Sequence, residues 1–175
     1  LAWMGFHVTD LEATGDVPVA EGSGVRGIAP YQAYSCSDGD LVVAAANDRL
    51  FEALATVLGH PDWVSDPRFS TNPERYRNLQ ELNAMIEPMF LAKQRSFWQA
   101  QLVKVGIPCA PLQTLDEVLK HPQVEALGLI EKNDDNEIPM VGIPLSFNNR
   151  RPPPASMAPK LGSYNDLFKK LSKGP

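Results

Sequence analysis

Proline is the feature that most restricts what this chain can fold into. The sequence has 16 prolines among 175 residues, about 9% against about 5% in average proteins. Seven of them lie from Pro139 onward, and Pro152, Pro153 and Pro154 are consecutive. Because proline lacks an amide hydrogen and breaks helix interiors, this C-terminal part cannot form a helical bundle. We expect it to be an extended strap lying across a surface.

Composition and charge exclude several classes of protein. Hydrophobic residues make up 43% of the chain and charged residues 21%, which allows a packed core. The formal net charge is −5 and there is no cluster of lysine and arginine, so we expect neither a nucleic-acid partner nor a polybasic membrane anchor. The longest apolar runs, such as residues 41–46, are too short to span a membrane. We expect a cytoplasmic protein, and a chain starting at Leu1 is expected to be part of a longer one.

A β-hairpin is predicted near the start of the globular part. Residues 31–36 and 41–46 are rich in strand-forming side chains, and the polar residues between them, including Asp38 and Gly39, favour a turn. The second of these segments is apolar on both faces. We therefore expect it to be a central, covered strand.

Residues 48–105 are predicted to form a set of helices. Asn47 is a favourable N-cap for the first helix. A second apolar-periodic segment contains Pro88, which should kink or end that helix just before the proline. Ser96 and Gln99 have the spacing of a capping box for a third helix.

The segments after residue 106 are predicted to form an extended link, a short helix and a second hairpin. Residues 107–113 are short and contain two prolines, which favours an extended link. Thr114 and Glu117 have capping-box spacing and predict a short helix. Residues 129–132 and 138–143 indicate a second hairpin.

The predicted fold class is α+β: a small domain with antiparallel β-hairpins and a helical set, an extended N-terminal arm and a C-terminal proline-rich strap. Residues 1–24 are expected to be a linker arm and residues 25–128 the small domain. Residues 129–175 would form the second β segment and the strap, with an amphipathic helix at residues 165–171.

Residue chemistry alone indicates no complete active site. Cys36 and Cys109 have no metal-binding spacing and are interpreted as structural thiols. His60 and His121 each precede a proline at an expected helix end, and His7 lies in the arm without a partner that would signal catalysis. The sequence contains no nucleophile elbow, phosphate loop or dinucleotide-binding fingerprint. We predict no catalytic residue and no metal ligand.

Glycines lead into the first predicted strand. Gly22, Gly24 and Gly27 precede residues 28–31. Glycine lets backbone amides approach a ligand closely, and such amides can hold an oxyanion or a carboxylate. A flexible linker is the alternative interpretation.

Several motifs in order resemble those of one enzyme family. They are residues 27–34, Asp38-Gly39, residues 42–48, residues 66–69 with Asn72 and Arg75, residues 106–111, Glu117-Val118, residues 121–124, residues 151–155 and Leu161-Gly162. Each motif is weak alone, but together they resemble the small domain of the family III CoA-transferases, the group of formyl-CoA, carnitine and bile-acid CoA-transferases. The resemblance runs from about residue 11 to residue 164.

This resemblance implies that the chain is the C-terminal part of a protein about twice as long. The catalytic aspartate of the family and most of its CoA-binding residues lie in the N-terminal large domain, so no catalytic residue is carried over and the chain alone is expected to be inactive. The implied substrates are an acyl-CoA and a free carboxylate. Coenzyme A enters as the thioester substrate, and no other cofactor is expected.

The resemblance also implies one substrate-binding segment. In relatives, a glycine loop before the first strand of the small domain covers the catalytic aspartate and shields its intermediates from water. The matching residues are Gly27, Ile28, Ala29, Pro30 and Tyr31. Relatives have consecutive glycines where this chain has Ile28, Ala29 and Pro30, and proline restricts the movement of such a loop.

Other interpretations remain open from the sequence. An α-methylacyl-CoA racemase-like enzyme has a similar fold, and a non-catalytic dimerisation or binding module would need no active site. The full-length protein is expected to be an interlocked homodimer, as in the family. Trp3 and Phe6 lie in the arm with little local core, so we expect them to contact another domain or subunit, or to remain mobile in the isolated chain.

Overall fold

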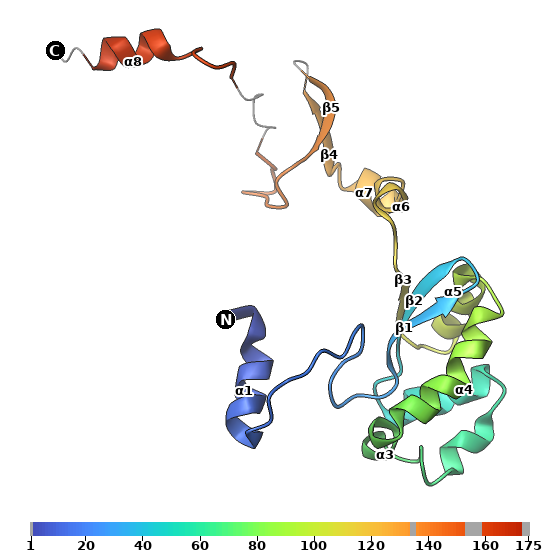
Figure 1. Ribbon diagram of the computed structural model, residues 1–175. Helices are drawn as coiled ribbons and strands as arrows, with labels where there is room; N and C mark the ends of the chain where they lie inside the picture. Colours follow the sequence, from blue (N-terminus) through green and yellow to red (C-terminus); the bar gives the residue numbers. More distant parts are fainter. Residues whose placement is uncertain (1, 134–135, 153–158, 173–175) are drawn as a thin grey trace. The chain divides into compact units, whose positions relative to one another are not determined.

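A computed structural model describes residues 2–133, 136–152 and 159–172 of the chain (Figure 1). The described chain divides into two compact units, Leu1–Leu112 and Gln113–Pro175. The predicted hairpin and helical set lie in the first unit. Residues 113–128, which were expected to belong to the small domain, group with the C-terminal part.

The first unit is built on a three-stranded antiparallel sheet. Strands β1 (Tyr31–Cys36) and β2 (Gly39–Ala44) form the predicted hairpin, with Tyr34 opposite Leu41. β2 lies between β1 and β3 (Cys109–Pro111), which confirms that it is central. β3 differs from the extended link that the sequence predicted, because the backbone of this segment pairs with β2.

Helices of residues 48–105 follow the hairpin, as predicted. They are α2 (Asp48–Val57), the 3-10 helix η2 (Pro61–Ser65), α3 (Asn72–Arg77), α4 (Leu79–Leu91) and α5 (Arg95–Lys104). The Asn47 side chain caps α2 by accepting a hydrogen bond of 2.9 Å from the Leu50 amide. Of the two effects predicted for Pro88, a kink or an end of the helix, the end does not occur: α4 continues to Leu91, and the buried Phe90 anchors its last turn.

The start of α5 differs from the prediction. The N-cap position is Gln94 instead of a capping box at Ser96, and its side chain makes no capping hydrogen bond. A carboxylate oxygen of Asp38, in the β1–β2 turn, accepts a hydrogen bond of 2.7 Å from the Arg95 amide. A carboxylate near a helix N-terminus is favourable. The hairpin turn therefore caps the helix, a long-range contact that local spacing does not reveal.

Aromatic side chains join the sheet to the helices. The rings of Tyr34 on β1 and Phe90 on α4 stack with centroids 4.9 Å apart, and Trp98 on α5 lies 4.9 Å from Phe90. The Trp98 indole donates a hydrogen bond of 2.9 Å to the Phe90 carbonyl. All three side chains are buried. Burial, and secondarily the charge of Glu87, raises the pKa of the Tyr34 hydroxyl, which therefore stays protonated.

The N-terminal arm contains a helix that the sequence did not predict. The 3-10 helix η1 (Ala2–Met4) leads into α1 (Gly5–Thr14). Neither helix has a buried residue, and the side chains of Trp3 and Phe6 are 100% and 94% exposed. α1 therefore has no core-facing stripe from which its periodicity could be recognised.

The second unit contains short helices and a hairpin. Its elements are α6 (Leu115–Leu119), α7 (Pro122–Ala126), β4 (Ile130–Asn133), β5 (Asn136–Val141) and α8 (Asn165–Leu171). The capping box of Thr114 and Glu117, the second hairpin and the last helix are confirmed. α7 was not predicted. Of the proline triplet, Pro153 and Pro154 lie outside the described residues. Together the two units confirm the predicted α+β class.

Candidate functional site

The segment before β1 is a tight turn that depends on glycine. The Ile28 amide donates a hydrogen bond of 3.2 Å to the Val25 carbonyl, and the Val25 amide donates one of 3.2 Å to the Tyr31 carbonyl. Gly27 has a φ of 77°, in the left-handed region that favours glycine. We call residues 27–31 the pre-strand loop.

Asn72, at the start of α3, holds the pre-strand loop at two backbone atoms. Its side-chain nitrogen donates a hydrogen bond of 2.8 Å to the Gly27 carbonyl. Its side-chain oxygen accepts one of 3.0 Å from the Ala29 amide. The side chain therefore bonds on either side of Ile28, in the way that a neighbouring strand would.

Arg75, one turn further along α3, holds the loop from inside the protein. Its side chain is fully buried, and Nε donates a hydrogen bond of 2.9 Å to the Ala29 carbonyl. One terminal nitrogen donates a hydrogen bond of 3.0 Å to the Phe69 carbonyl, and the other donates one of 2.7 Å to a carboxylate oxygen of Asp48. The guanidinium also lies 4.4 Å from the centre of the Phe51 ring. One side chain thus joins the loop to α2 and to the turn before α3.

The structure separates the five predicted substrate-binding residues into two groups. Gly27 and Ile28 line a pocket of about 650 Å³. Ala29 and Pro30 are buried, and the Pro30 carbonyl accepts a hydrogen bond of 3.0 Å from the Ala45 amide. Tyr31 begins β1 and is paired with Ala44. Only the first two residues are placed where a ligand in this pocket would reach them.

The pocket beside the loop is lined by both apolar and charged side chains. Its remaining lining residues come from α1, from α3 and from the turn that precedes the pre-strand loop: Phe6, His7, Asp10, Val25, Arg26 and Tyr76. Arg26 Nη1 lies 3.2 Å from a carboxylate oxygen of Asp10. Within the described residues this nitrogen is buried and makes no geometrically favourable hydrogen bond. The ion pair therefore ties α1 to the turn that precedes the loop.

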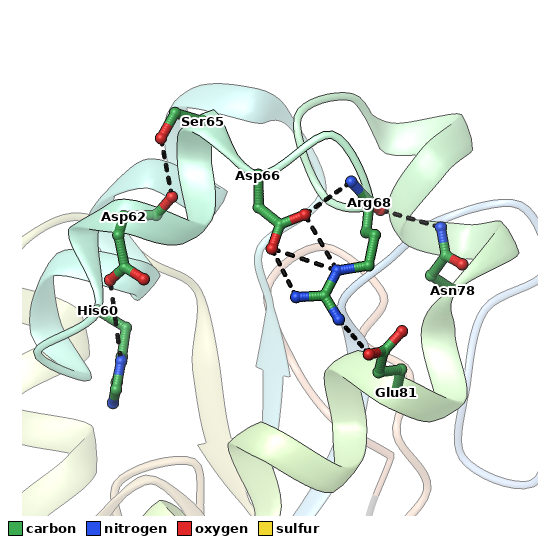
Figure 2. A network of polar contacts seen from close by, with 7 residues as sticks. All are labelled: His60, Asp62, Ser65, Asp66, Arg68, Asn78 and Glu81. Carbon is green, nitrogen blue, oxygen red and sulfur yellow. Dashed lines mark hydrogen bonds and ion pairs between the residues drawn. The ribbon is translucent and has the colours of Figure 1, made fainter.

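A polar network fixes the chain between η2 and α4 (Figure 2). The Asp66 carboxylate accepts hydrogen bonds from the Arg68 amide at 2.9 Å and from its guanidinium at 2.6 Å. The guanidinium of Arg68 lies between Asp66 and Glu81 and contacts both carboxylates. Asn78 donates a hydrogen bond of 3.2 Å to the Arg68 carbonyl. This network joins the turn after η2 to the start of α4.

The stabilisation by Arg68 should disappear in acid. Its hydrogen bonds hold the pKa of the Asp66 carboxyl below the usual value. A carboxyl with a lowered pKa in the folded state contributes stability above its unfolded pKa of about 3.9, and this contribution is lost as the pH falls through the lowered pKa. Arg68→Gln should therefore lower the urea midpoint at pH 6, and the difference from the unmodified chain should shrink as the pH falls below about 3.9. The matched variant Arg49→Gln, at an exposed arginine, should not show this pH dependence. If Arg68→Gln lowers the urea midpoint equally at pH 6 and in acid, the stabilisation does not come from the ionised Asp66 carboxylate.

The remaining reactive side chains have structural surroundings. Burial raises the pKa of the Cys36 thiol to about 11 and also raises the pKa of Cys109, so neither is a ready nucleophile. The His60 ring stacks on Trp63 with centroids 4.7 Å apart, and His121 Nδ1 accepts a hydrogen bond of 3.1 Å from the Gln123 amide. Across residues 2–133, 136–152 and 159–172, no group of three or more histidine, cysteine or acidic residues forms a metal site.

The second unit has its own pockets and anchors. A mostly apolar pocket of about 630 Å³ lies between α6, α7 and the β4–β5 hairpin. Arg151, at the start of the strap, donates a hydrogen bond of 3.1 Å to the Leu127 carbonyl and contacts the Gly128 carbonyl. None of the helices in the described part of the chain is long and apolar enough to cross a membrane.

The sequence predicted the loop but missed the side chains that hold it. Asn72 and Arg75 appeared only as parts of a motif, because the loop residue that both of them bind, Ala29, is more than 40 residues away in the chain. The available signal was Arg75 itself, a charged residue in a segment between buried Phe69 and buried Leu82. A buried charge requires partners, and here they include a backbone carbonyl of the loop.

Comparison with known proteins identifies a consistent set of relatives. The model of CoA-transferase family III matches residues 1–165. An acetyl-CoA:oxalate CoA-transferase from Acetobacter aceti is 29% identical over 100% of this chain and 45% of its own length. An acyl-CoA transferase from Fusarium pseudograminearum is 32% identical over 78% of this chain and 31% of its own length.

A solved structure agrees with these sequence relatives. A CAIB/BAIF family protein from Brucella suis is 30% identical, with a TM-score of 0.82 over 97% of this chain and 44% of the other. The chain therefore spans less than half the length of the relatives that it matches.

Proposed function

Because this chain belongs to CoA-transferase family III, we propose that it is part of an enzyme that moves coenzyme A between an acyl-CoA and a free carboxylic acid. The observation that carries the proposal is the family match, which extends through both structural units. The catalytic aspartate would be supplied by a large domain outside this sequence. We expect coenzyme A to act only as the thioester substrate, with no further cofactor.

The proposed contribution of this chain is to cover the reacting groups and to form part of the acyl pocket. Exchange between a thioester and a carboxylate through an acyl-enzyme anhydride requires a carboxylate nucleophile and donors for the developing oxyanion. It also requires that water be kept from the anhydride. The pre-strand loop is suited to the last task because its backbone is fixed and Ile28 lines a pocket.

We propose a dicarboxylic acid as the acceptor. The names of several relatives contain oxalate, glutarate or succinyl-CoA, which are dicarboxylic acids or their thioester. The specific acid would depend on contacts made jointly with the large domain. We also propose that the full-length enzyme is a cytoplasmic, interlocked homodimer.

The full-length enzyme tests this proposal directly. It should transfer CoA from succinyl-CoA or acetyl-CoA to oxalate, succinate or glutarate. Separating and quantifying the acyl-CoA thioesters after the reaction measures this transfer. In heavy water it should not introduce deuterium at the α-carbon of a branched acyl-CoA, whereas a racemase would. Deuterium incorporation without transfer would replace this proposal with the racemase, and the absence of both activities would favour a binding module.

A further inference from the structure

We propose that Asn72 and Arg75 are positioning residues, which hold the pre-strand loop in the form that excludes water during transfer. This inference rests on the proposed function. Neither side chain lines the pocket, so both would act through the loop.

Asn72 determines the shape of the loop at its exposed end. Its side-chain amide bonds to the Gly27 carbonyl and to the Ala29 amide at the same time, at 2.8 and 3.0 Å. An amide is suited to this task because it carries a donor and an acceptor side by side. Ile28, between the two anchored residues, is half-buried and lines the pocket. Fixing both neighbours therefore fixes where Ile28 meets a ligand.

Arg75 determines the position of the loop relative to the core. Its three hydrogen bonds point to the Ala29 carbonyl, the Phe69 carbonyl and Asp48, and its side chain is fully buried. A guanidinium makes such a set because its donors spread within one plane, whereas a lysine ammonium is a single point on a flexible stem. Arg75 therefore joins the loop to groups that are themselves held in the core.

These anchors hold a buried part of the loop, Ala29 and Pro30, and an exposed part at Gly27. Ala29 and Pro30 are held by Arg75 and by the Ala45 amide, and both are buried. Residues before Gly27 are held by the turn at Val25, by the ion pair of Arg26 with Asp10, and by hydrogen bonds from the Tyr76 hydroxyl to Glu21 and from the Ala33 amide to Ser23. Displacing Ile28 would therefore require Asn72 to release the Gly27 carbonyl and the Ala29 amide.

The test compares two asparagine variants. Asn72→Ala removes both loop bonds, whereas Asn72→Asp keeps the acceptor for the Ala29 amide and loses the donor to the Gly27 carbonyl. Asn78→Ala is the control, because Asn78 bonds to the Glu74 and Arg68 carbonyls of the same region and not to the loop. Hydrogen exchange of the Ala29 amide is measured in the 175-residue chain. The ratio of acyl-CoA hydrolysis to CoA transfer is measured in the full-length enzyme.

Asn72→Ala should speed exchange of the Ala29 amide about tenfold, the equivalent of one hydrogen bond, and should raise the hydrolysis-to-transfer ratio by a similar factor. Asn72→Asp should retain more of the Ala29 protection than Asn72→Ala. Asn78→Ala should leave the ratio unchanged even if it lowers stability. This ratio is the readout that a purely structural role would not alter.

The outcomes separate this inference from the proposed function. If the unmodified enzyme transfers no CoA, the proposed function is wrong and the inference fails with it. If the enzyme transfers CoA but Asn72→Ala leaves the hydrolysis-to-transfer ratio at the level of Asn78→Ala, the function stands and the positioning role is refuted. Unchanged exchange of the Ala29 amide would likewise refute the anchor.

Discussion

Replacing Arg75 with methionine should lower the free energy of unfolding by about 3–4 kcal/mol. Methionine fills much of the same volume, but it leaves the Ala29 and Phe69 carbonyls without the donors that they have now. A buried polar group left without its partner costs about 1–3 kcal/mol. Asp48 adds little to this loss, because its side chain is 69% exposed and water replaces the ion pair.

Urea unfolding followed by tryptophan fluorescence measures this loss. Arg77→Met is the matched control on the same helix, since Arg77 is exposed and pairs only with the neighbouring Glu74 among the described contacts. It should change the free energy of unfolding by less than about 1 kcal/mol. Arg75→Lys keeps the charge without the planar set of donors and should fall between the two. A loss for Arg75→Met as small as that for Arg77→Met would contradict the role given to the buried guanidinium.

The purified 175-residue chain should show no CoA transfer with any pair of acyl-CoA and carboxylate. His60, His121 and the two cysteines have structural surroundings. In the pocket beside the loop, Asp10 is paired with Arg26, and we expect His7 alone not to catalyse the transfer. The pre-strand loop would cover a reaction whose nucleophile it does not supply. CoA transfer by the isolated chain is measured with thioester assays that use succinyl-CoA or acetyl-CoA and excess oxalate or glutarate. Turnover above background would mean that this chain carries a catalytic residue of its own.

Local signals predicted the elements whose ends depend on nearby residues. The N-cap at Asn47, the capping box at Thr114 and the turn between β1 and β2 each act within a few positions, and each was confirmed. The apolar run in β2 also indicated a central strand correctly, because a strand covered on both faces needs no alternation.

Elements that depend on distant partners were missed. β3 contains Pro111 and lies just after Pro108, yet it pairs with β2 at the edge of the sheet, where proline is tolerated. The Asp38 carboxylate caps α5 from 57 positions away, so the capping box expected at Ser96 was wrong. α1 has no buried face in this chain and so left no periodic pattern.

The candidate site shows the same division between local and distant information. The glycine at residue 27 marked the turn, and its φ of 77° explains why glycine is needed there. The resemblance to the family then assigned a role to residues 27–31. Which of them face the pocket depended on hydrogen bonds from Asn72, Arg75 and Ala45, and these follow only from the fold.

We propose that this chain completes a CoA-transferase without carrying its reacting carboxylate. The most direct test of this claim is to assay CoA transfer to a dicarboxylate with the chain alone, with its large domain alone, and with the two co-expressed and purified together. We predict transfer only for the co-purified pair. Transfer by the chain alone, or equal transfer by the large domain with and without this chain, would contradict the claim.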